Sequence, residues 1–323
     1  MLAWLGRRAA AALAILWTVA TLTFVAIHLA PGDPFLPTAE RPADPAVVAE
    51  LRRQFGLDRP LTVQYARYLR ALSTGDLGMS FSQRRPVAAA IADALPHTLL
   101  LAAAALLLDY VLGITIGLVQ ATTAGRRLDD WLTAVTLMVA SLPAFWVALV
   151  LLLVFGEWLR WLPVAGAYDP AIYDALPLAG RLADRLRHLA LPAITLGLLG
   201  AAGTARYQRA ALLDALGQEF VRTARAKGVT ERRVLLVHAW RNALVPITAL
   251  LGLALPFLLT GAVLVETVFG WPGLGRLAAD AINLRDYPLV TGTAITASAV
   301  VVLGSVVADL LLHVADPRVR LED

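Results

Sequence analysis

The residues Thr98–Thr122 read TLLLAAAALLLDYVLGITIGLVQAT and contain one charged side chain, Asp109. A helix that crosses a bilayer needs about 20 mostly apolar residues, because the hydrocarbon core is about 30 Å thick and each residue rises about 1.5 Å. The whole chain agrees with a membrane location: 59% of its residues are hydrophobic and 16% are charged. Charged residues alone make up about a quarter of a soluble globular protein. This stretch therefore predicts a transmembrane helix.

Five further stretches predict membrane-spanning helices by the same test of length and apolar character. The first follows Arg7 and Arg8, is too long for a signal-peptide core, and ends at Pro31 without a small-x-small cleavage site, so we expect an uncleaved anchor. The sequence thus predicts an all-α, polytopic membrane protein with six spans, at about Ala9–Leu29, Thr98–Thr122, Trp131–Phe155, Leu189–Ala205, Leu244–Phe269 and Pro288–Leu312.

Arginine gathers in the short loops beside these spans, and the arginine and lysine content of short loops sets membrane orientation. The loops that fall on one side, which we expect to be cytoplasmic, hold Arg7 with Arg8, Arg126 with Arg127, the cluster from Arg206 to Arg241, and Arg318 with Arg320. The segment Asp33–Pro96 also contains arginines but is too long for the rule to apply. Both termini are therefore predicted to face the cytoplasm.

The topology divides the chain into four parts. Residues 1–30 form an N-terminal transmembrane helix, residues 31–96 an extracytoplasmic segment, residues 97–312 a membrane core with a cytoplasmic loop at 206–243, and residues 313–323 a cytoplasmic tail. Two amphipathic patterns at helical spacing predict short helices on the outer face, one through Val47, Val48, Leu51 and Phe55 and one through Tyr65, Tyr68, Leu69 and Leu72.

Composition also excludes several classes of function. The net charge of +4 is explained by loop arginines next to spans, so we expect a lipid bilayer and no nucleic acid as partner. The chain has no cysteine, which excludes disulfides and thiolate metal sites. Its one lysine, Lys227, lies between Ala226 and Gly228, so there is no phosphate-binding P-loop. If ATP drives this protein, partner subunits bind the ATP and its Mg.

The cytoplasmic loop is the most informative hydrophilic segment. Helix-forming residues from Glu219 to Lys227 stop at Gly228, where a left-handed cap is expected, and Thr230 with Glu231 predicts the start of a second helix toward Pro246. A transporter with a separate ATPase needs a short rigid element that docks in a groove and tilts transmembrane helices. The alternative is a loop that is basic only because topology requires it.

The stretch Arg222-Thr223-Ala224-Arg225-Ala226-Lys227-Gly228 resembles the EAA loop of ABC importer permeases, in the form found in the dipeptide, oligopeptide and nickel branch. The general family pattern is Glu-Ala-Ala, three residues, Gly, then nine residues before Ile-x-Leu-Pro. This chain has Arg-Thr-Ala in the first three places, keeps the glycine, and reaches Pro246 several residues late. It is therefore similar to the peptide-branch variant of the loop.

Further stretches resemble the first permease subunit of the same branch, in the same order along nearly the whole chain: His28–Pro34, Phe55–Pro60, Gln64-Tyr65, Gly75–Ser80, Glu266–Gly275, Arg285–Pro288 and Asp316–Arg318. The resemblance implies the six-helix transmembrane domain of a type I ABC importer in a bacterial or archaeal cytoplasmic membrane. It also implies a second homologous permease, two ATPase subunits or domains, and an extracytoplasmic substrate-binding protein. Di- or oligopeptides are the expected substrates; nickel complexes and other small solutes remain open, because the binding protein largely sets selectivity.

The glycine- and proline-rich stretches of the outer face allow two interpretations. They would serve as turns after spans in any membrane protein. The family resemblance implies instead a lid or a docking surface for the binding protein. The residues concerned are Pro31, Gly32, Asp33, Pro34, Pro272, Gly273 and Gly275.

Ionisable and small residues within the spans are candidates for the substrate path or for helix packing. Asp109 could line the path, but a lone acid among leucines more often bonds to a neighbouring helix. Glu266 and Asp309 lie near helix ends, which favours a structural role. The small residues allow helices to approach closely, or would line a path that accepts varied side chains; they are Gly113, Gly117, Gly197, Gly200, Ala201 and Gly203.

The sequence favours an importer permease over two other functions. An ion-coupled secondary transporter usually shows internal repeats and several buried acids, whereas this chain shows one central acid, Asp109, and no convincing repeat. A membrane-embedded hydrolase needs a nucleophile with a base nearby, and no such set is distinguishable. We therefore predict no catalytic and no metal-binding residues in this chain.

Overall fold

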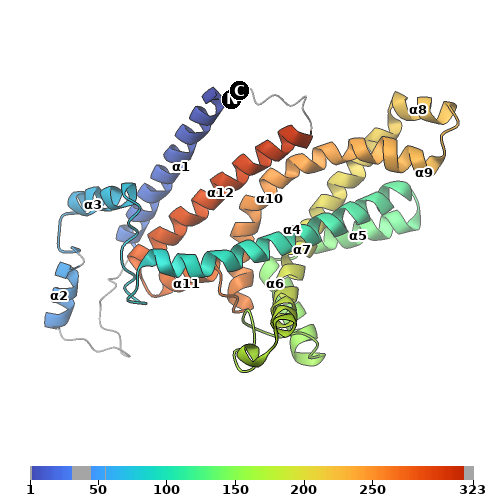
Figure 1. Ribbon diagram of the computed structural model, residues 1–323. Helices are drawn as coiled ribbons and strands as arrows, with labels where there is room; N and C mark the ends of the chain where they lie inside the picture. The colour runs from blue at the N-terminus through green and yellow to red at the C-terminus, as the bar shows by residue number, and fades with distance from the viewer. Residues whose placement is uncertain (1, 31–44, 55, 316–323) are drawn as a thin grey trace.

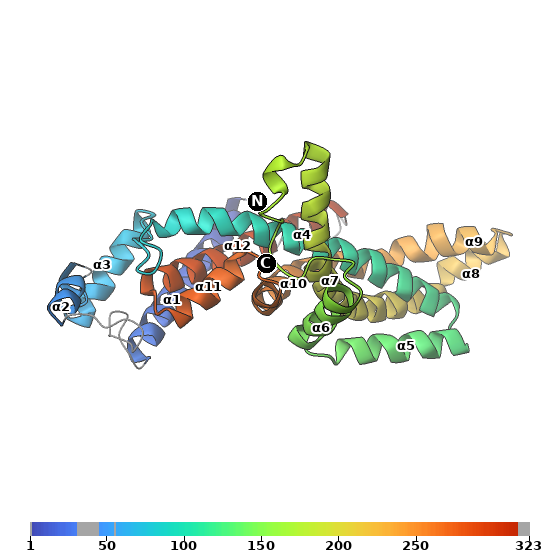
Figure 2. The ribbon, with the colours of Figure 1, turned by 90° about the horizontal axis from the view of Figure 1, so that it is seen from below.

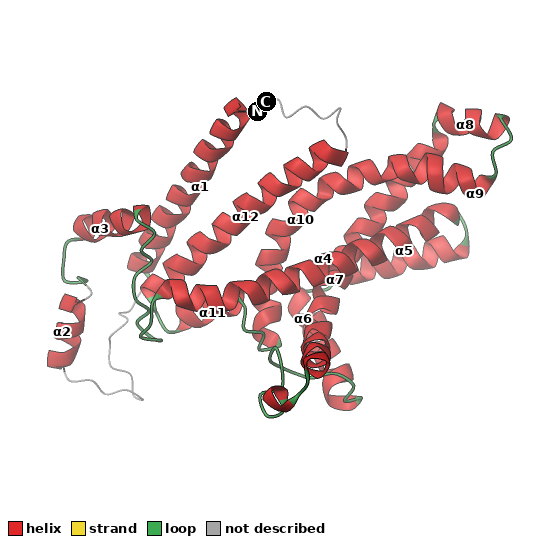
Figure 3. Ribbon diagram, viewed as in Figure 1, coloured by secondary structure: helices red, strands yellow, loops and turns green. Residues whose placement is uncertain are grey.

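The computed structural model describes residues 2–30, 45–54 and 56–315, and only the backbone is described at residues 2–5, 251–261, 311–315 and a few single positions. This part of the chain is helical and contains no β-strand (Figure 3). The fold is therefore all-α, as predicted. Pro31, Gly32, Asp33, Pro34 and the tail beyond Ala315 lie outside the described residues.

The described helices follow one another as shown in Figure 1. Two of them, η1 and η3, are π-helices, and η2 is a short 3-10 helix. Their bounds are α1 Leu2–Leu29, α2 Pro45–Gln54, α3 Leu61–Ser73, α4 Val87–Thr122, α5 Arg127–Ala140, α6 Ala144–Leu151, η1 Leu152–Trp158, η2 Tyr173–Ala175, α7 Leu178–Gly217, α8 Glu219–Ala226, α9 Glu231–Arg233, η3 Val234–Ala239, α10 Trp240–Val268, α11 Leu274–Asn283 and α12 Tyr287–Ala315.

Four described helices are long and apolar enough to cross a membrane: α1, α4, α7 and α12. The helices α5 and α6 together with η1 form a fifth candidate, bent by 103° at a short break. The helix α10 occupies the remaining predicted span. The predicted helices of the outer segment are also confirmed, because α2 and α3 form where the two amphipathic patterns lie.

The predicted span Trp131–Phe155 is wrong as a single straight helix. The helix α5 ends at Ala140, and α6 starts after Pro143, whose ring disfavours helical geometry at the residue before it. The fourth predicted span, Leu189–Ala205, was too short, since α7 runs for 40 residues and includes Pro192. The helix α4 likewise begins at Val87, ahead of Pro96, because its first turns bury apolar side chains.

The helices α4 and α7 form the closest packed pair. A β-carbon at Gly113 would lie 2.6 Å from Cβ of Thr204, and one at Gly197 would lie 2.7 Å from Cβ of Leu108. Such contacts are possible only because glycine has no side chain, which is how transmembrane helices bring their backbones together. The helix-packing prediction is confirmed for Gly113, and the same tight contacts occur at Gly117, Gly197 and Gly200, whereas a β-carbon at Gly203 would meet open space.

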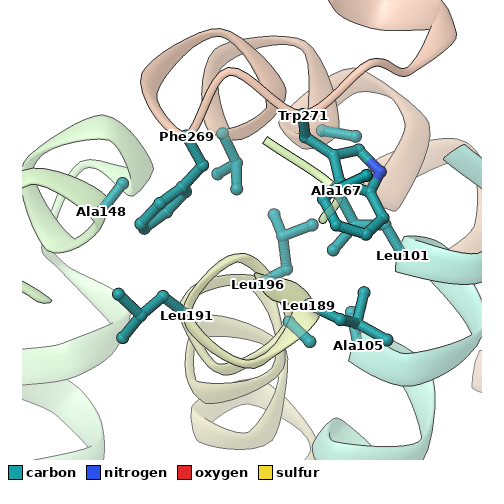
Figure 4. Close-up of a cluster of buried hydrophobic side chains, with 12 residues drawn as sticks. Leu101, Ala105, Ala148, Ala167, Leu189, Leu191, Leu196, Phe269 and Trp271 are labelled. Carbon is teal, nitrogen blue, oxygen red and sulfur yellow. The ribbon is translucent and has the colours of Figure 1, made fainter. Parts of the chain in front are cut away.

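The main apolar core lies where α4, α6, α7 and the end of α10 meet. Figure 4 shows Phe269 and Trp271 pointing down onto α7, with Ala148 of α6 on one side and Leu101 of α4 on the other. Phe269 and Trp271 are both buried. The helices α2 and α3 lie at one extreme of the molecule, and α8 and α9 at the opposite one (Figures 1 and 2).

Candidate functional site

The helix α8 is short, amphipathic and exposed. Two of its side chains, Val221 and Ala224, are buried three residues apart on one face, while Arg222, Thr223 and Arg225 face outward. Glu219 occupies the first turn and Arg225 the last, which suits the helix dipole. The sequence thus specifies a helix with one face packed on this chain and one face exposed.

The buried face of α8 belongs to an apolar cluster, here called the α8 cluster, which joins the ends of four helices. It links α8 to the end of α4, the last turns of α7, η3 and the start of α10; its buried members are Ala121, Leu212, Ala215, Val221, Ala224, Val234, Ala239 and Ala243. The buried face of α8 therefore shares one apolar cluster with three long helices, α4, α7 and α10.

Gly228 ends α8 in the predicted left-handed conformation, with φ of +76°. Its N–H donates to the Arg225 carbonyl at 2.9 Å, and the next N–H, of Val229, returns to the Ala224 carbonyl at 3.2 Å. These bonds satisfy carbonyl groups at the helix end. Space around Gly228 is open, since nothing lies within 4 Å of a β-carbon built there. The predicted glycine cap is confirmed.

The second predicted helix of the loop starts where expected but differs in form. Thr230 occupies the N-cap position of α9 and Glu231 its first turn, as predicted, although the Thr230 side chain makes no capping hydrogen bond. One turn of α9 passes into the π-helix η3 and then into α10 without a break in the helical path. Short π-helical segments often occur at functional sites.

Two exposed ion pairs brace α8. Arg225 donates to both carboxylate oxygens of Glu231, with Nε to Oε1 at 2.8 Å and Nη2 to Oε2 at 3.1 Å, and Arg222 pairs with Glu219 at 2.8 Å. The hydrogen bonds and charge of Arg225 hold the pKa of the Glu231 carboxyl below its ordinary value. The pair ties the end of α8 to the start of α9 across the glycine turn.

A partly buried ion pair near α8 was not predicted. Arg209 of α7 donates to Asp129 of α5 through Nε at 2.9 Å and Nη2 at 2.7 Å. The N–H of Gly125, in the turn between α4 and α5, also donates to this carboxylate at 3.2 Å. Residues 129 and 209 are 80 positions apart, and no pattern in the sequence connects them. The only available signal was that both lie in arginine-rich, acid-containing loops at span ends.

At the other end of the bundle, Glu266 is fully buried and accepts hydrogen bonds from two elements. Thr98 Oγ1 of α4 donates to it at 2.7 Å, and the N–H of Arg276 in the first turn of α11 donates at 2.9 Å. A β-carbon at Gly273 would lie 2.3 Å from the carboxyl carbon of Glu266. Gly273 and Gly275 therefore leave room for a carboxylate that caps α11, and the expected structural role of Glu266 is confirmed.

A second buried carboxylate, Asp286, joins two stretches that the sequence placed far apart. Its Oδ2 accepts hydrogen bonds from Ser80 Oγ at 2.5 Å, from the Ser82 N–H at 2.8 Å and from Ser82 Oγ at 2.7 Å. Its Oδ1 accepts one from the Leu289 N–H in the first turn of α12 at 3.2 Å. The loop after α3 is thereby fixed to the start of α12.

Asp109 bonds to a neighbouring helix, as expected. Thr204 Oγ1 of α7 donates to its Oδ1 at 2.6 Å, and the carboxylate lies over Gly200, where any β-carbon would clash with it. Asp309 pairs with Arg8, which joins α12 to α1. In the part of the chain that the structure describes, no three His, Asp or Glu side chains are grouped in a way that could hold a metal ion.

The structure is a helical membrane bundle that carries an exposed, glycine-ended helix on the ends of its long helices. The model of the family described as "binding-protein-dependent transport system inner membrane component" matches residues 113–321, and the model of that family's N-terminal part matches residues 1–102. The chain belongs to this family.

Curated relatives resemble this chain along nearly its full length. It is 40% identical to the di/tripeptide transport system permease protein DppB of Pseudomonas aeruginosa, with 99% of each chain covered. It is 36% identical to the dipeptide transport system permease protein DppB of Escherichia coli K12, with 94% of each covered. It is also 36% identical to the oligopeptide transport system permease protein AppB of Bacillus subtilis, with 99% of this chain and 100% of that protein covered.

These findings confirm the predicted family, fold class and general function: the chain is a multi-pass inner-membrane permease subunit of a binding-protein-dependent importer. They do not favour the ion-coupled secondary transporter. The importer is a multi-subunit assembly of which this chain is one component. The roles predicted for individual residues of α8 and of the outer face stay predictions.

Proposed function

We propose that this permease forms the membrane path for di- or oligopeptides together with a second homologous permease, and that α8 is the helix on which a separate ATPase subunit docks. The observation that carries the docking role is the form of α8: a short helix with two buried anchors, Val221 and Ala224, and a free outer face. ATP binding would close the ATPase subunits, move α8 and open the path to the outside. An extracytoplasmic binding protein would deliver the substrate.

The names of the relatives support peptides as the substrate class. The relatives reported above are named as permeases for di/tripeptides, dipeptides or oligopeptides, and each matches this chain over nearly its whole length. A further relative, 38% identical, is the glutathione transport system permease protein GsiC of Salmonella paratyphi A. Short peptides, including modified ones, are therefore the substrates we propose.

The proposed orientation places both termini and α8 in the cytoplasm. The pairing of Arg8, near the start of α1, with Asp309, near the end of α12, places these two helix ends side by side. The helix α10 starts at the α8 cluster and ends at the Glu266 site, and α12 returns, so its end lies on the side of α8. In this natively cysteine-free chain, Asp58→Cys should be labelled by an impermeant maleimide only from outside; labelling only from the cytoplasm would reverse the topology.

The proposed energy supply lies outside this chain. Lys227 ends the exposed helix α8 and is not part of a phosphate-binding loop between a strand and a helix. We expect the purified subunit alone neither to bind nor to hydrolyse ATP. Equilibrium binding with a fluorescent ATP analogue checks this expectation, and micromolar affinity for the isolated chain would overturn the proposed division of labour.

Gly228→Val tests the docking role in the assembled complex. A β-branched residue at φ of +76° carries strain of about 1 to 2 kcal/mol and adds bulk at the docking surface. Membrane insertion and assembly should stay normal while stimulation of the ATPase by substrate-loaded binding protein is lost. Gly75→Val is the matched control, because Gly75 has φ of +77° and equally open space but follows α3. If both variants retain the stimulation of the ATPase by substrate-loaded binding protein, the loop is only a topological spacer.

A further inference from the structure

The helix α5 is attached to this chain in an unusual way. Its two buried residues, Asp129 and Thr136, are both polar. Several of its large apolar side chains point outward: Trp131 is 62% exposed and Met138 is 60% exposed. Between helices in lipid there is little hydrophobic driving force, so polar contacts and close packing hold them together. The polar contacts of α5 therefore decide how firmly it follows its neighbours.

Asp129 makes the strongest of these contacts. It is 2% exposed and receives two N–H groups from the Arg209 guanidinium, one from the Gly125 backbone and the hydroxyl of Thr133 at 3.4 Å. Bidentate bonds between arginine and carboxylate fix both distance and orientation. The pair holds the start of α5 and the turn before it against α7 in one geometry.

The ion pair of Asp129 and Arg209 lies next to the α8 cluster. Arg209 is three residues before Leu212, which is fully buried in the α8 cluster and is therefore about one turn away on the same helix. The helix α7 continues to Gly217 and passes into α8 through Gln218 alone. Any movement of α8 that turns or tilts the end of α7 thus acts on Arg209 within two turns.

We infer that Asp129 and Arg209 are positioning residues that make α5 move with α7 when the ATPase displaces α8. This inference rests on the proposed docking role of α8 and names the route by which its movement reaches a second helix. The route then continues through the 103° bend into α6, whose Ala148 packs in the main core with Phe269. The bend converts a shift of α5 along its axis into a sideways push on α6.

The energetics of ion pairs that are at least partly buried, as this one is through Asp129, fit a positioning role better than a stabilising one. Removing two charges from water costs free energy that their attraction only partly returns, so such pairs are weak contributors to stability. Their best-attested use is to fix one geometry among alternatives. Arg209 keeps about a third of its side chain exposed, 34%, which leaves the pair at the rim of the bundle, where the docked ATPase acts.

The test uses the assembled complex in proteoliposomes with Asp129→Asn, Arg209→Gln and the double variant. Each should lower the ratio of stimulated to basal ATPase activity about tenfold, within the range found for mutations along a coupling route. The double variant should be no worse than either single one, because the two residues act as a unit. Arg209→Lys, which keeps the charge and one hydrogen bond, should recover part of the coupling.

A second readout separates positioning from stability. In a Met138→Cys background, thiol labelling of α5 should change when ATP is added, and Asp129→Asn should abolish that change while a cysteine at Thr223 on α8 still responds. Asp309→Asn is the matched control, because it removes another acid–arginine pair between helices, at α1 and α12, away from α8.

The outcomes distinguish this inference from the proposed function. If Asp129→Asn keeps both the stimulation and the labelling change at Met138→Cys, or if Asp309→Asn uncouples the complex equally, the inference is wrong. If Gly228→Val uncouples the complex and Asp129→Asn does not, the proposed docking role of α8 is kept and only the proposed coupling of α5 to α7 is wrong. If neither variant uncouples it, the docking role falls as well.

Discussion

The Glu266 end of the bundle and the helix α8 place their charged residues in opposite ways. At the Glu266 end, Glu266 and Asp286 are each 0% exposed, and hydroxyl and backbone N–H groups from separate elements donate to them. On α8, the charged side chains are exposed and pair only with close neighbours in sequence, as Arg225 does with Glu231. The Glu266 end uses charge to join elements to each other, whereas α8 itself presents charge to the surroundings.

This difference shows that a sequence motif shared with a family can serve the fold rather than a partner. The stretch Glu266–Gly275 was compatible with a turn or with a docking surface. Because Gly273 closely approaches the buried Glu266, this stretch has a structural role inside the protein. Contact of the same stretch with a binding protein stays a prediction. The exposed side chains of α8, by contrast, pair only within α8 or with the start of α9.

The largest expected effect is that of Gly273→Ala at the buried end. The new β-carbon would lie 2.3 Å from the Glu266 carboxyl carbon, so the carboxylate must leave its hydrogen bonds or α11 must shift. Disturbing a buried charge and overpacking it should together cost about 3 kcal/mol or more of folding free energy. The melting temperature of the purified protein in detergent measures this loss.

Gly203→Ala is the matched control for Gly273→Ala. Nothing lies within 4 Å of a β-carbon at Gly203, and alanine favours helix over glycine, so this variant should melt at or slightly above the temperature of the parent chain. Equal melting temperatures for Gly273→Ala and Gly203→Ala would show that the close approach of Gly273 to Glu266 does not stabilise the fold.

An intermediate effect is expected for Asp286→Asn. The substitution removes the charge that accepts hydrogen bonds from Ser80 and Ser82, and hydrogen bonds to charged groups contribute about 1.5 to 3 kcal/mol each. We expect a loss of about 2 kcal/mol and faster proteolysis in the loop after α3. The exposed Asp280→Asn on α11 serves as comparison, and an equal loss there would contradict the assigned role of Asp286.

Local signals in the sequence predicted the local features of this structure. Apolar runs located the spans of α1, α4 and α12, helical spacing located α2 and α3, and Gly228 located the end of α8. Each of these local patterns depends on residues that lie a few positions apart in the sequence. The break before α6 was missed although Pro143 was visible, because the apolar run continues on both sides of it.

Partners distant in sequence could not be predicted. Glu266 meets Thr98 across 168 positions and Arg209 meets Asp129 across 80, and the choice of partner depends on how the helices pack. The expectation for Asp109 succeeded only in kind: a bond to another helix was expected, but Thr204 was not identified. The extra length of α7 was missed because its extensions carry charged side chains, and that of α4 was missed because it lies ahead of Pro96, although it is mostly apolar.

The smallest effect is expected for the exposed pair of Arg225 and Glu231. Because Arg225 lowers the pKa of Glu231, the pair stabilises the folded turn at neutral pH and loses that contribution as pH falls through the lowered pKa, below the ordinary value of about 4.3. Amide hydrogen exchange at Gly228 and Val229 should speed up in Arg225→Gln at pH 7. The melting temperature should not change; a clear drop would mean that the charges of α8 also hold the fold.

Site-directed cross-linking tests the central claim, that α8 is the surface on which the ATPase docks, most directly. In the cysteine-free chain, Thr223→Cys places a cross-linker on the free face of α8, and Thr74→Cys places the same probe on an exposed threonine after α3. In the assembled, coupled complex we predict a cross-link to the ATPase subunit from residue 223 and none from residue 74. A complex that hydrolyses ATP in response to substrate but cross-links to its ATPase only from residue 74, or from neither position, would contradict the account.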